Sequence, residues 1–230
     1  MKNVIKRNET LSSQVYEYLR EKILIGGLTP GQRLVEERIV EETGVSRSPI
    51  REAIRRLEKD GLVVVNMQGG VTVYKPTFQD FTHLYECRLS LEPAAARYAA
   101  ERRSDEDVSR LREMMEKVKV LSYQQDAMQI HELNFAFHQL IAEGSQNPYL
   151  MKMMKDLKVL ISFYRNAILQ VDPKRPESVM AEHEAIFQAI AEQNGERAYK
   201  QMEKHIRSDY QLCMDAYRQL TEKGEAYGQT

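Results

Sequence analysis

The chain has 230 residues, of which 42% are hydrophobic and 29% are charged, and its formal net charge at pH 7 is −1. This composition excludes a disordered chain, and the lack of any apolar run of about 18 residues excludes a membrane span. The first residues lack the apolar core of a signal peptide, and the two cysteines, Cys87 and Cys213, are too distant to form a disulfide framework. We therefore expect a cytoplasmic protein.

Charge is distributed unevenly along the chain. Residues 1–75 contain 13 Lys and Arg against 10 Asp and Glu, whereas the remaining residues contain 20 against 24. A basic first part and an acidic second part indicate two modules with different partners.

The first part is expected to hold three helices and a hairpin. Apolar residues recur at helical spacing in 10–25, a short second helix is expected at 34–44, and a third at about 46–60. Ser46 is a natural N-cap of the third helix, and Pro49 falls in its first turn, where its missing N–H costs nothing. Two β-branched runs then flank Gln68-Gly69-Gly70, a pattern typical of a hairpin. These elements predict a winged helix-turn-helix.

The second part is predicted to be entirely helical. Breaks at Ser104, Asp126, "GSQNP", "DPKRP" and Asn194-Gly195 separate the helical patterns. The six expected helices are 79–102, 104–122, 126–144, 148–170, 177–193 and 195–222. The fold class is therefore mainly α, with a winged helix-turn-helix followed by an all-α bundle of about six helices.

The third helix has a strongly basic outward face. Its apolar residues form one stripe, while Arg47, Arg51 and Arg55 form another on a different side. A helix of this kind fits the major groove of DNA, where arginine reads guanine, and residues near its N-terminus approach the bases most closely. A solvated charged face is the alternative. The residues expected at the DNA are Ser46, Arg47, Ser48, Pro49, Arg51, Arg55, Gln68 and Gly69.

Two segments carry a resemblance to a known family. "PGQRL" at 30–34 and "GVSRSPIREAIRRLEKDGLV" at 44–63 resemble the DNA-binding domain of the GntR family of bacterial transcription regulators. That family often places an arginine that touches DNA seven residues before the turn glycine, whereas this chain has Glu37 there. A helix-turn-helix gains affinity from two half-sites, so we expect a homodimer on a palindromic double-stranded DNA operator.

The second part resembles one branch of that family. "LYECRLSLEPAAARYAA" at 84–100 is similar to the FadR-type branch, which carries an FCD effector domain. The resemblance implies a regulator, and we expect a repressor, controlled by a small organic acid, with no catalytic activity. The expected division is a DNA-binding domain at 1–75, a linker at 76–80, an effector-binding and dimerisation domain at 81–222, and a tail at 223–230.

The FCD resemblance also implies a metal site. In many members of the branch, an Asp or Asn and three histidines bind a metal inside the bundle. This chain offers Asn134 and His138 in "NFAFH", four residues apart on one helical face, followed by His183 and His205 on later helices. Imidazole ligands suit a divalent transition metal such as Zn or Ni. Histidines satisfied within the core are the alternative.

Arg88 lies among apolar positions of the first bundle helix, where an unpaired arginine is costly. The resemblance favours a carboxylate of the effector as its partner, and a salt bridge to Glu92, four residues on, is the alternative. Arg165 and Tyr85 are further candidates for effector binding. Three other hypotheses stay open at this point: a metal-free regulator, a metal-dependent enzyme, and a purely architectural DNA-binding protein.

Overall fold

The structure, a computed structural model, describes residues 10–121, 123–168 and 176–222. The tail expected at 223–230 lies outside the described residues. The chain divides into two compact units, of which the first contains the described residues 10–77 and 162–168, and the second contains the other described residues from Phe78 onward. Each unit is described by itself.

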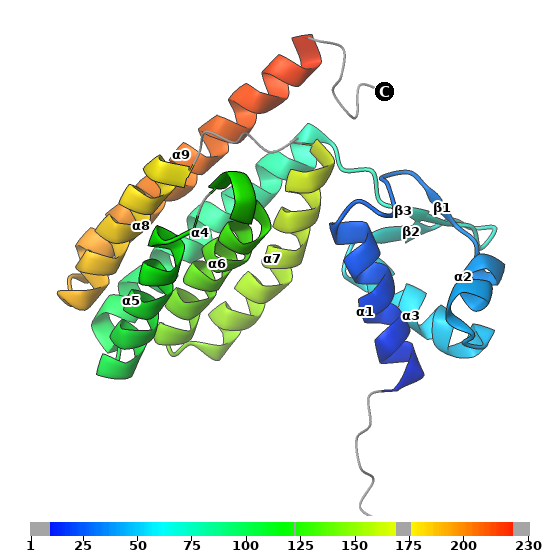
Figure 1. Ribbon diagram of the computed structural model, residues 1–230, viewed down its shortest axis with the longest axis horizontal. Helices are drawn as coiled ribbons and strands as arrows, with labels where there is room; N and C mark the ends of the chain where they lie inside the picture. Colours follow the sequence, from blue (N-terminus) through cyan, green and yellow to red (C-terminus); the bar gives the residue numbers. More distant parts are fainter. Residues whose placement is uncertain (1–9, 122, 169–175, 223–230) are drawn as a thin grey trace, which may run out of the picture. The chain divides into compact units, whose positions relative to one another are not determined.

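The first unit is a winged helix-turn-helix, coloured blue to cyan in Figure 1. Its three strands form an antiparallel sheet in the order β1-β3-β2, in which Leu34 pairs with Val71 and Val64 pairs with Thr72. The predicted helices and hairpin are confirmed, and β1 is an addition. The elements are α1 (Leu11–Leu24), β1 (Arg33–Leu34), α2 (Glu36–Thr43), α3 (Arg47–Lys59), β2 (Val63–Val65) and β3 (Val71–Val73).

The apolar stripe of α3 forms the centre of this unit. Ile50, Ala53 and Leu57 are fully buried, and α3 packs against both α1 and α2. A polar contact also links the C-terminal end of α3 to α1. The hydroxyl of Tyr16 on α1 donates a hydrogen bond of 2.5 Å to Asp60, which directly follows α3. The apolar side of α3 is thus fixed to the unit, which leaves its basic side outward.

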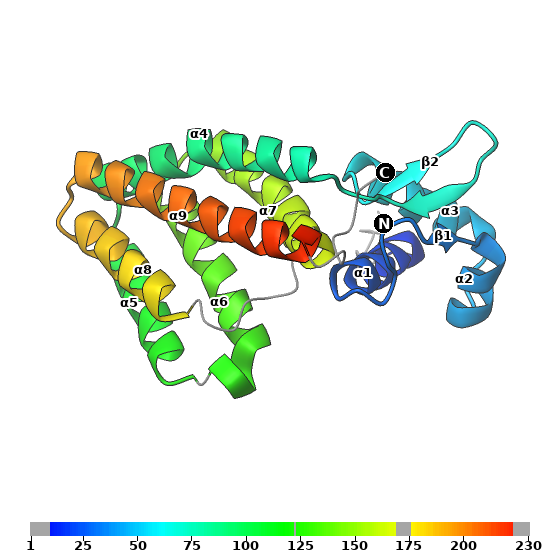
Figure 2. The same ribbon diagram turned by 90° about the horizontal axis from the view of Figure 1, so that it is seen from above.

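The described residues from Phe78 onward form six helices, as predicted. Figures 1 and 2 show α4 and α9 side by side, with α8 along α9 and α6 along α4. None of the described helices is long and apolar enough to cross a membrane. The helices are α4 (Phe78–Arg102), α5 (Asp105–Lys119), α6 (Tyr123–Gly144), α7 (Pro148–Ile168), α8 (Pro176–Ala191) and α9 (Gly195–Glu222).

Candidate nucleic-acid interface and metal centre

The basic face of α3 is exposed. Ser46, Arg47, Ser48, Arg51 and Arg55 are all exposed, and Pro49 in the first turn is half-buried. α3 begins directly after the turn made by Gly44, whose φ of 69° closes α2 in the left-handed conformation that glycine adopts without strain. This turn brings α2 close to the start of α3.

Two arginines of this face are paired with α2. Arg47 donates from Nη2 to Glu37 over 2.9 Å, and Arg51 donates from Nε to both carboxylate oxygens of Glu36 over 3.0 Å. The side chains of Arg47 and Arg51 are each 59% exposed, so these ion pairs lie on the surface. Sequence reasoning noted Glu37 as a departure from the family but did not predict either pair.

The hairpin turn between β2 and β3 is fixed by one side chain. The Asn66 Oδ1 accepts hydrogen bonds from the backbone N–H groups of Gln68 (3.1 Å) and Gly70 (2.7 Å). Gly69 has a φ of 79°, which favours glycine, and both Gln68 and Gly69 are exposed. The turn therefore presents Gln68 and Gly69 outward, as the hairpin pattern predicted.

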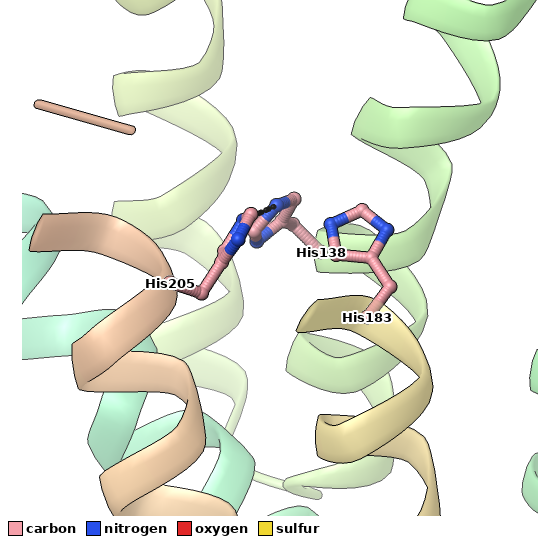
Figure 3. Close-up of side chains that lie close together, drawn as sticks. All are labelled: His138, His183 and His205. Carbon is pink, nitrogen blue, oxygen red and sulfur yellow. Dashed lines mark hydrogen bonds between the residues drawn. The ribbon is translucent and has the colours of Figure 1, made fainter. Parts of the chain in front are cut away.

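Three histidines meet inside the helical unit. His138 of α6, His183 of α8 and His205 of α9 are buried, and each offers a ring nitrogen within 4.8 Å of the others (Figure 3). The Nε2 atoms of His138 and His205 lie 3.3 Å apart. The ring of His183 stacks on Phe137 with a centroid separation of 3.9 Å, which fixes its orientation. The structure thus brings together the three histidines that the sequence singled out.

Carboxylates contact the Nδ1 atoms of two of these histidines. Glu92 Oε2 lies 2.6 Å from His138 Nδ1, and Glu182 Oε2 lies 2.7 Å from His205 Nδ1. An ionised carboxylate next to Nδ1 favours the tautomer with its proton on that nitrogen, which leaves the lone pair on Nε2 for a metal. Sequence reasoning missed Glu182, although it directly precedes His183, and considered Glu92 only as a partner of Arg88.

The residues present fit a transition-metal ion. Metal–nitrogen bonds of about 2.0–2.1 Å place neighbouring imidazole nitrogens about 2.9–3.4 Å apart. The separation of 3.3 Å between the His138 and His205 Nε2 atoms falls in that range, and the nitrogen of His183 lies within 4.8 Å of both, so it would move inward to reach the same ion. Asn134, one turn before His138 on α6, has a buried Oδ1 with no hydrogen-bond partner among the described residues. Its carbonyl oxygen is therefore available as a fourth ligand.

Arg88 is buried beside the histidines and forms two ion pairs. It donates from Nε to Glu92 Oε1 (2.5 Å) and from Nη1 to Asp209 Oδ2 (2.6 Å), and Tyr85 donates its hydroxyl proton to the same Asp209 oxygen (2.6 Å). Burial alone would raise the pKa of Glu92, but the charge of the adjacent Arg88 and its hydrogen bond lower it below its usual range. The salt bridge to Glu92, one of the two alternatives left open by the sequence, is present. The side chain of Arg165 lies outside the described residues.

A winged helix-turn-helix followed along the chain by a helical bundle is an architecture found in transcription regulators. The family model of bacterial regulatory proteins of the GntR family matches residues 11–73, and that of the FCD domain matches residues 83–208. The chain therefore belongs to the GntR family and carries an FCD domain. The members of this family, and the relatives that resemble this chain, are transcription regulators and not enzymes. FCD domains often bind metals.

Individual relatives agree with this assignment. The HTH-type transcriptional regulator YdhC of Bacillus subtilis is 32% identical over 197 residues, which cover 85% of this chain and 88% of YdhC. The HTH-type transcriptional repressor RspR of Escherichia coli is 26% identical over 216 residues, covering 94% of this chain and 92% of RspR. Among solved structures, McbR/YncC of E. coli has a TM-score of 0.76 at 24% identity, covering 91% of this chain and all of that one, so the two share a fold.

Proposed function

We propose that this chain is a homodimeric repressor whose affinity for a palindromic operator is controlled by a small organic acid bound in a metal-containing helical domain. Residues 1–75 bind DNA, and residues 81–222 bind the effector and pair the two copies. The observation that carries the proposal is the convergence of three buried histidine nitrogens, two of them backed by carboxylates, inside the FCD domain. The likeness to a protein named a repressor supports the sign of regulation.

At the DNA, the outward face of α3 enters the major groove. Arg47, Ser48 and Arg51 lie in its first turns and contact bases or the phosphates next to them, while Arg55 contacts phosphates. Ser46 and Pro49 belong to the same end of the helix, which approaches the duplex most closely. Gln68 and Gly69 of the hairpin turn press on the neighbouring backbone, where the glycine allows close approach. The exposure of the charged side chains of this set supports these roles.

At the metal site, His138, His183 and His205 hold the ion together with Asn134. A divalent transition metal such as Zn or Ni held there would supply a Lewis acid that attracts a carboxylate. Glu92 and Glu182 orient the imidazoles of His138 and His205. Asn134 contributes a neutral oxygen, so the binding site keeps more of the positive charge of the metal than an aspartate would leave.

The effector carboxylate binds beside the histidine cluster. We predict that Arg88 and Tyr85, with Arg165, contact it. For Arg88 and Tyr85 this requires the carboxylate to displace Asp209, which now accepts a hydrogen bond from each of them. Such an exchange replaces one carboxylate by another at the same guanidinium, so the buried charge of Arg88 stays paired. Asp209 lies on α9, and its release gives effector binding a direct effect on the contact between α4 and α9.

Two experiments test this function. The wild-type chain is used to select duplexes from a random-sequence library, and Arg51→Ala is then titrated against the selected duplex. A bidentate base contact predicts a loss of about 1–3 kcal/mol, whereas unchanged affinity rejects the role of Arg51. Elemental analysis of the purified chain gives the metal content, and His183→Ala is expected to remove the metal. Equal metal content in the two proteins rejects the ligand role of His183.

A metal-free regulator is the second candidate, and one observation favours it. The Nε2 atoms of His138 and His205 are within hydrogen-bond distance of each other, so a shared proton also accounts for their approach. Dialysis of the purified protein against a chelator distinguishes the two candidates. The metal-containing regulator loses thermal stability on dialysis and recovers it when Zn or Ni is restored, whereas the metal-free regulator shows the same melting temperature throughout.

A further inference from the structure

The first turn of α2 places two carboxylates against the basic face of α3. Glu36 accepts from Arg51 and Glu37 accepts from Arg47. Glu36 is only 24% exposed, while the arginines are 59% exposed, so the pairs hold the arginines at the surface without drawing them into the unit. Neither carboxylate is needed to balance a buried charge.

The two pairs leave most of the arginine hydrogen-bond donors available. A guanidinium group carries five N–H donors. Glu36 accepts from Nε of Arg51, so both terminal nitrogens, the fork that reads the O6 and N7 atoms of guanine, have no partner among the described residues. Glu37 accepts from Nη2 of Arg47, which keeps the donors on Nε and Nη1. Pairing therefore fixes the positions of the guanidinium groups and preserves their capacity to read bases.

We propose that Glu36 and Glu37 are specificity-determining residues of DNA binding, which orient Arg51 and Arg47 for matching bases and weaken binding to all other sequences. The inference rests on the proposed DNA-binding role of α3 and deepens it. Binding to unrelated DNA depends on attraction to phosphates, and a carboxylate next to each arginine reduces that attraction for every sequence alike. The orientation of the guanidinium groups is an advantage only where the correct base accepts their hydrogen bonds.

Glu37 is the more informative of the two. Its side chain is 60% exposed, so its negative charge lies at the surface beside Arg47. A like charge near the phosphates raises the cost of every non-specific encounter. The expected consequence is a regulator that binds unrelated DNA weakly and depends on its cognate bases for affinity.

The test compares specific with non-specific affinity. The probes are the duplex that the wild-type chain selects from a random library and a scrambled duplex of equal length and composition. Dissociation constants for both are measured at several salt concentrations for wild type, Glu36→Gln, Glu37→Gln and Glu41→Gln. Glu41 is the matched control, because it is exposed one turn after Glu37 on α2 and forms no ion pair with any described residue.

For Glu37→Gln we expect affinity for the scrambled duplex to rise about fivefold. Affinity for the selected duplex changes less than about twofold, because the weaker orientation of Arg47 offsets the stronger attraction to phosphates. For Glu36→Gln we expect the selected duplex to be bound several-fold more weakly, because a neutral amide orients Arg51 less firmly than the carboxylate does. Glu37→Arg is expected to raise non-specific affinity further than Glu37→Gln does. Since exposed ion pairs contribute little to stability, all these variants are expected to melt close to the wild-type temperature.

Unchanged ratios of specific to non-specific affinity in Glu36→Gln and Glu37→Gln would overturn the inference. Equal changes in Glu41→Gln would also overturn it, because they would show an effect of net charge alone. A wild-type chain that enriches no duplex from the library rejects the DNA-binding proposal itself and, with it, this inference. Failure of the inference alone leaves a selected duplex that wild type still binds.

Discussion

Replacement of Glu92 by glutamine probes the link between the buried ion pairs and the histidine cluster. Glu92 contacts Arg88 Nε through one oxygen (2.5 Å) and His138 Nδ1 through the other (2.6 Å), and all three side chains are buried. Removing one partner of a buried ion pair costs about 3–5 kcal/mol. Because Arg88 keeps Asp209 as a second partner, we expect a loss near the lower end, about 3 kcal/mol, or roughly 6–12 °C in melting temperature.

The same substitution changes the tautomer of His138. The glutamine carbonyl oxygen accepts from Arg88, so its amide group faces Nδ1 of His138 and donates to it. The imidazole proton then moves to Nε2, the nitrogen that faces His205, and it must leave that nitrogen before a metal binds there. Mutation of a residue that hydrogen-bonds to a metal ligand lowers metal affinity by about 10–100-fold. We expect the loss in Glu92→Gln to lie at the upper end of that range.

The assay has two readouts, thermal melting and competition for the metal with a chromophoric chelator. Glu86→Gln is the control, because Glu86 is an exposed residue of the same helix, α4. Glu92→Gln is expected to show both losses and Glu86→Gln neither. Metal affinity equal to that of Glu86→Gln would refute the reasoning about the tautomer, whatever the effect on melting.

Three further predictions concern other contacts of the structure. Glu182→Gln is expected to lower metal affinity about 10–100-fold through His205, which metal titration measures, and an unchanged affinity would show that His205 needs no carboxylate. Leu57→Ala empties a fully buried position of α3 and is expected to cost about 2–5 kcal/mol in a urea denaturation, so a loss below about 1 kcal/mol would contradict the packing of α3. Burial and the bond to Asp60 raise the pKa of Tyr16 above its usual range, so the stabilisation is present below about pH 10 and is lost as the pH rises further. Tyr16→Phe is therefore expected to lose less stability above about pH 10 than wild type loses. If both proteins lose the same stability there, the contact between Tyr16 and Asp60 is excluded.

The helices could be predicted because their apolar residues recur at helical spacing and because residues typical of helix ends mark their limits. Ser104 illustrates this, since it caps α5 in a reciprocal pair of hydrogen bonds with Asp107. The strand β1 was missed because two residues carry no period, and its pairing with β3 depends on a distant segment.

Within the site, the sequence predicted the three histidines but not the carboxylates that contact two of them. His138, His183 and His205 carry a spacing pattern, whereas the contact of Glu182 with His205 depends on how α8 and α9 pack. Asp209 is a similar case, because its bond to Arg88 joins residues 121 positions apart. The pairs between α2 and α3 were also missed, since the rotamers of exposed arginines are not determined by periodicity.

The central claim is that the outward face of α3 lies in the groove of a duplex. A direct test places a cysteine at exposed position 48, as Ser48→Cys in a Cys87→Ser background, and attaches a chelated iron that cleaves nearby DNA. On the duplex selected by wild type, the account predicts strand cleavage confined to a few nucleotides within each half-site. The account would be contradicted if the complex forms, as a gel shift shows, but the half-sites are not cleaved or cleavage is spread evenly along the duplex.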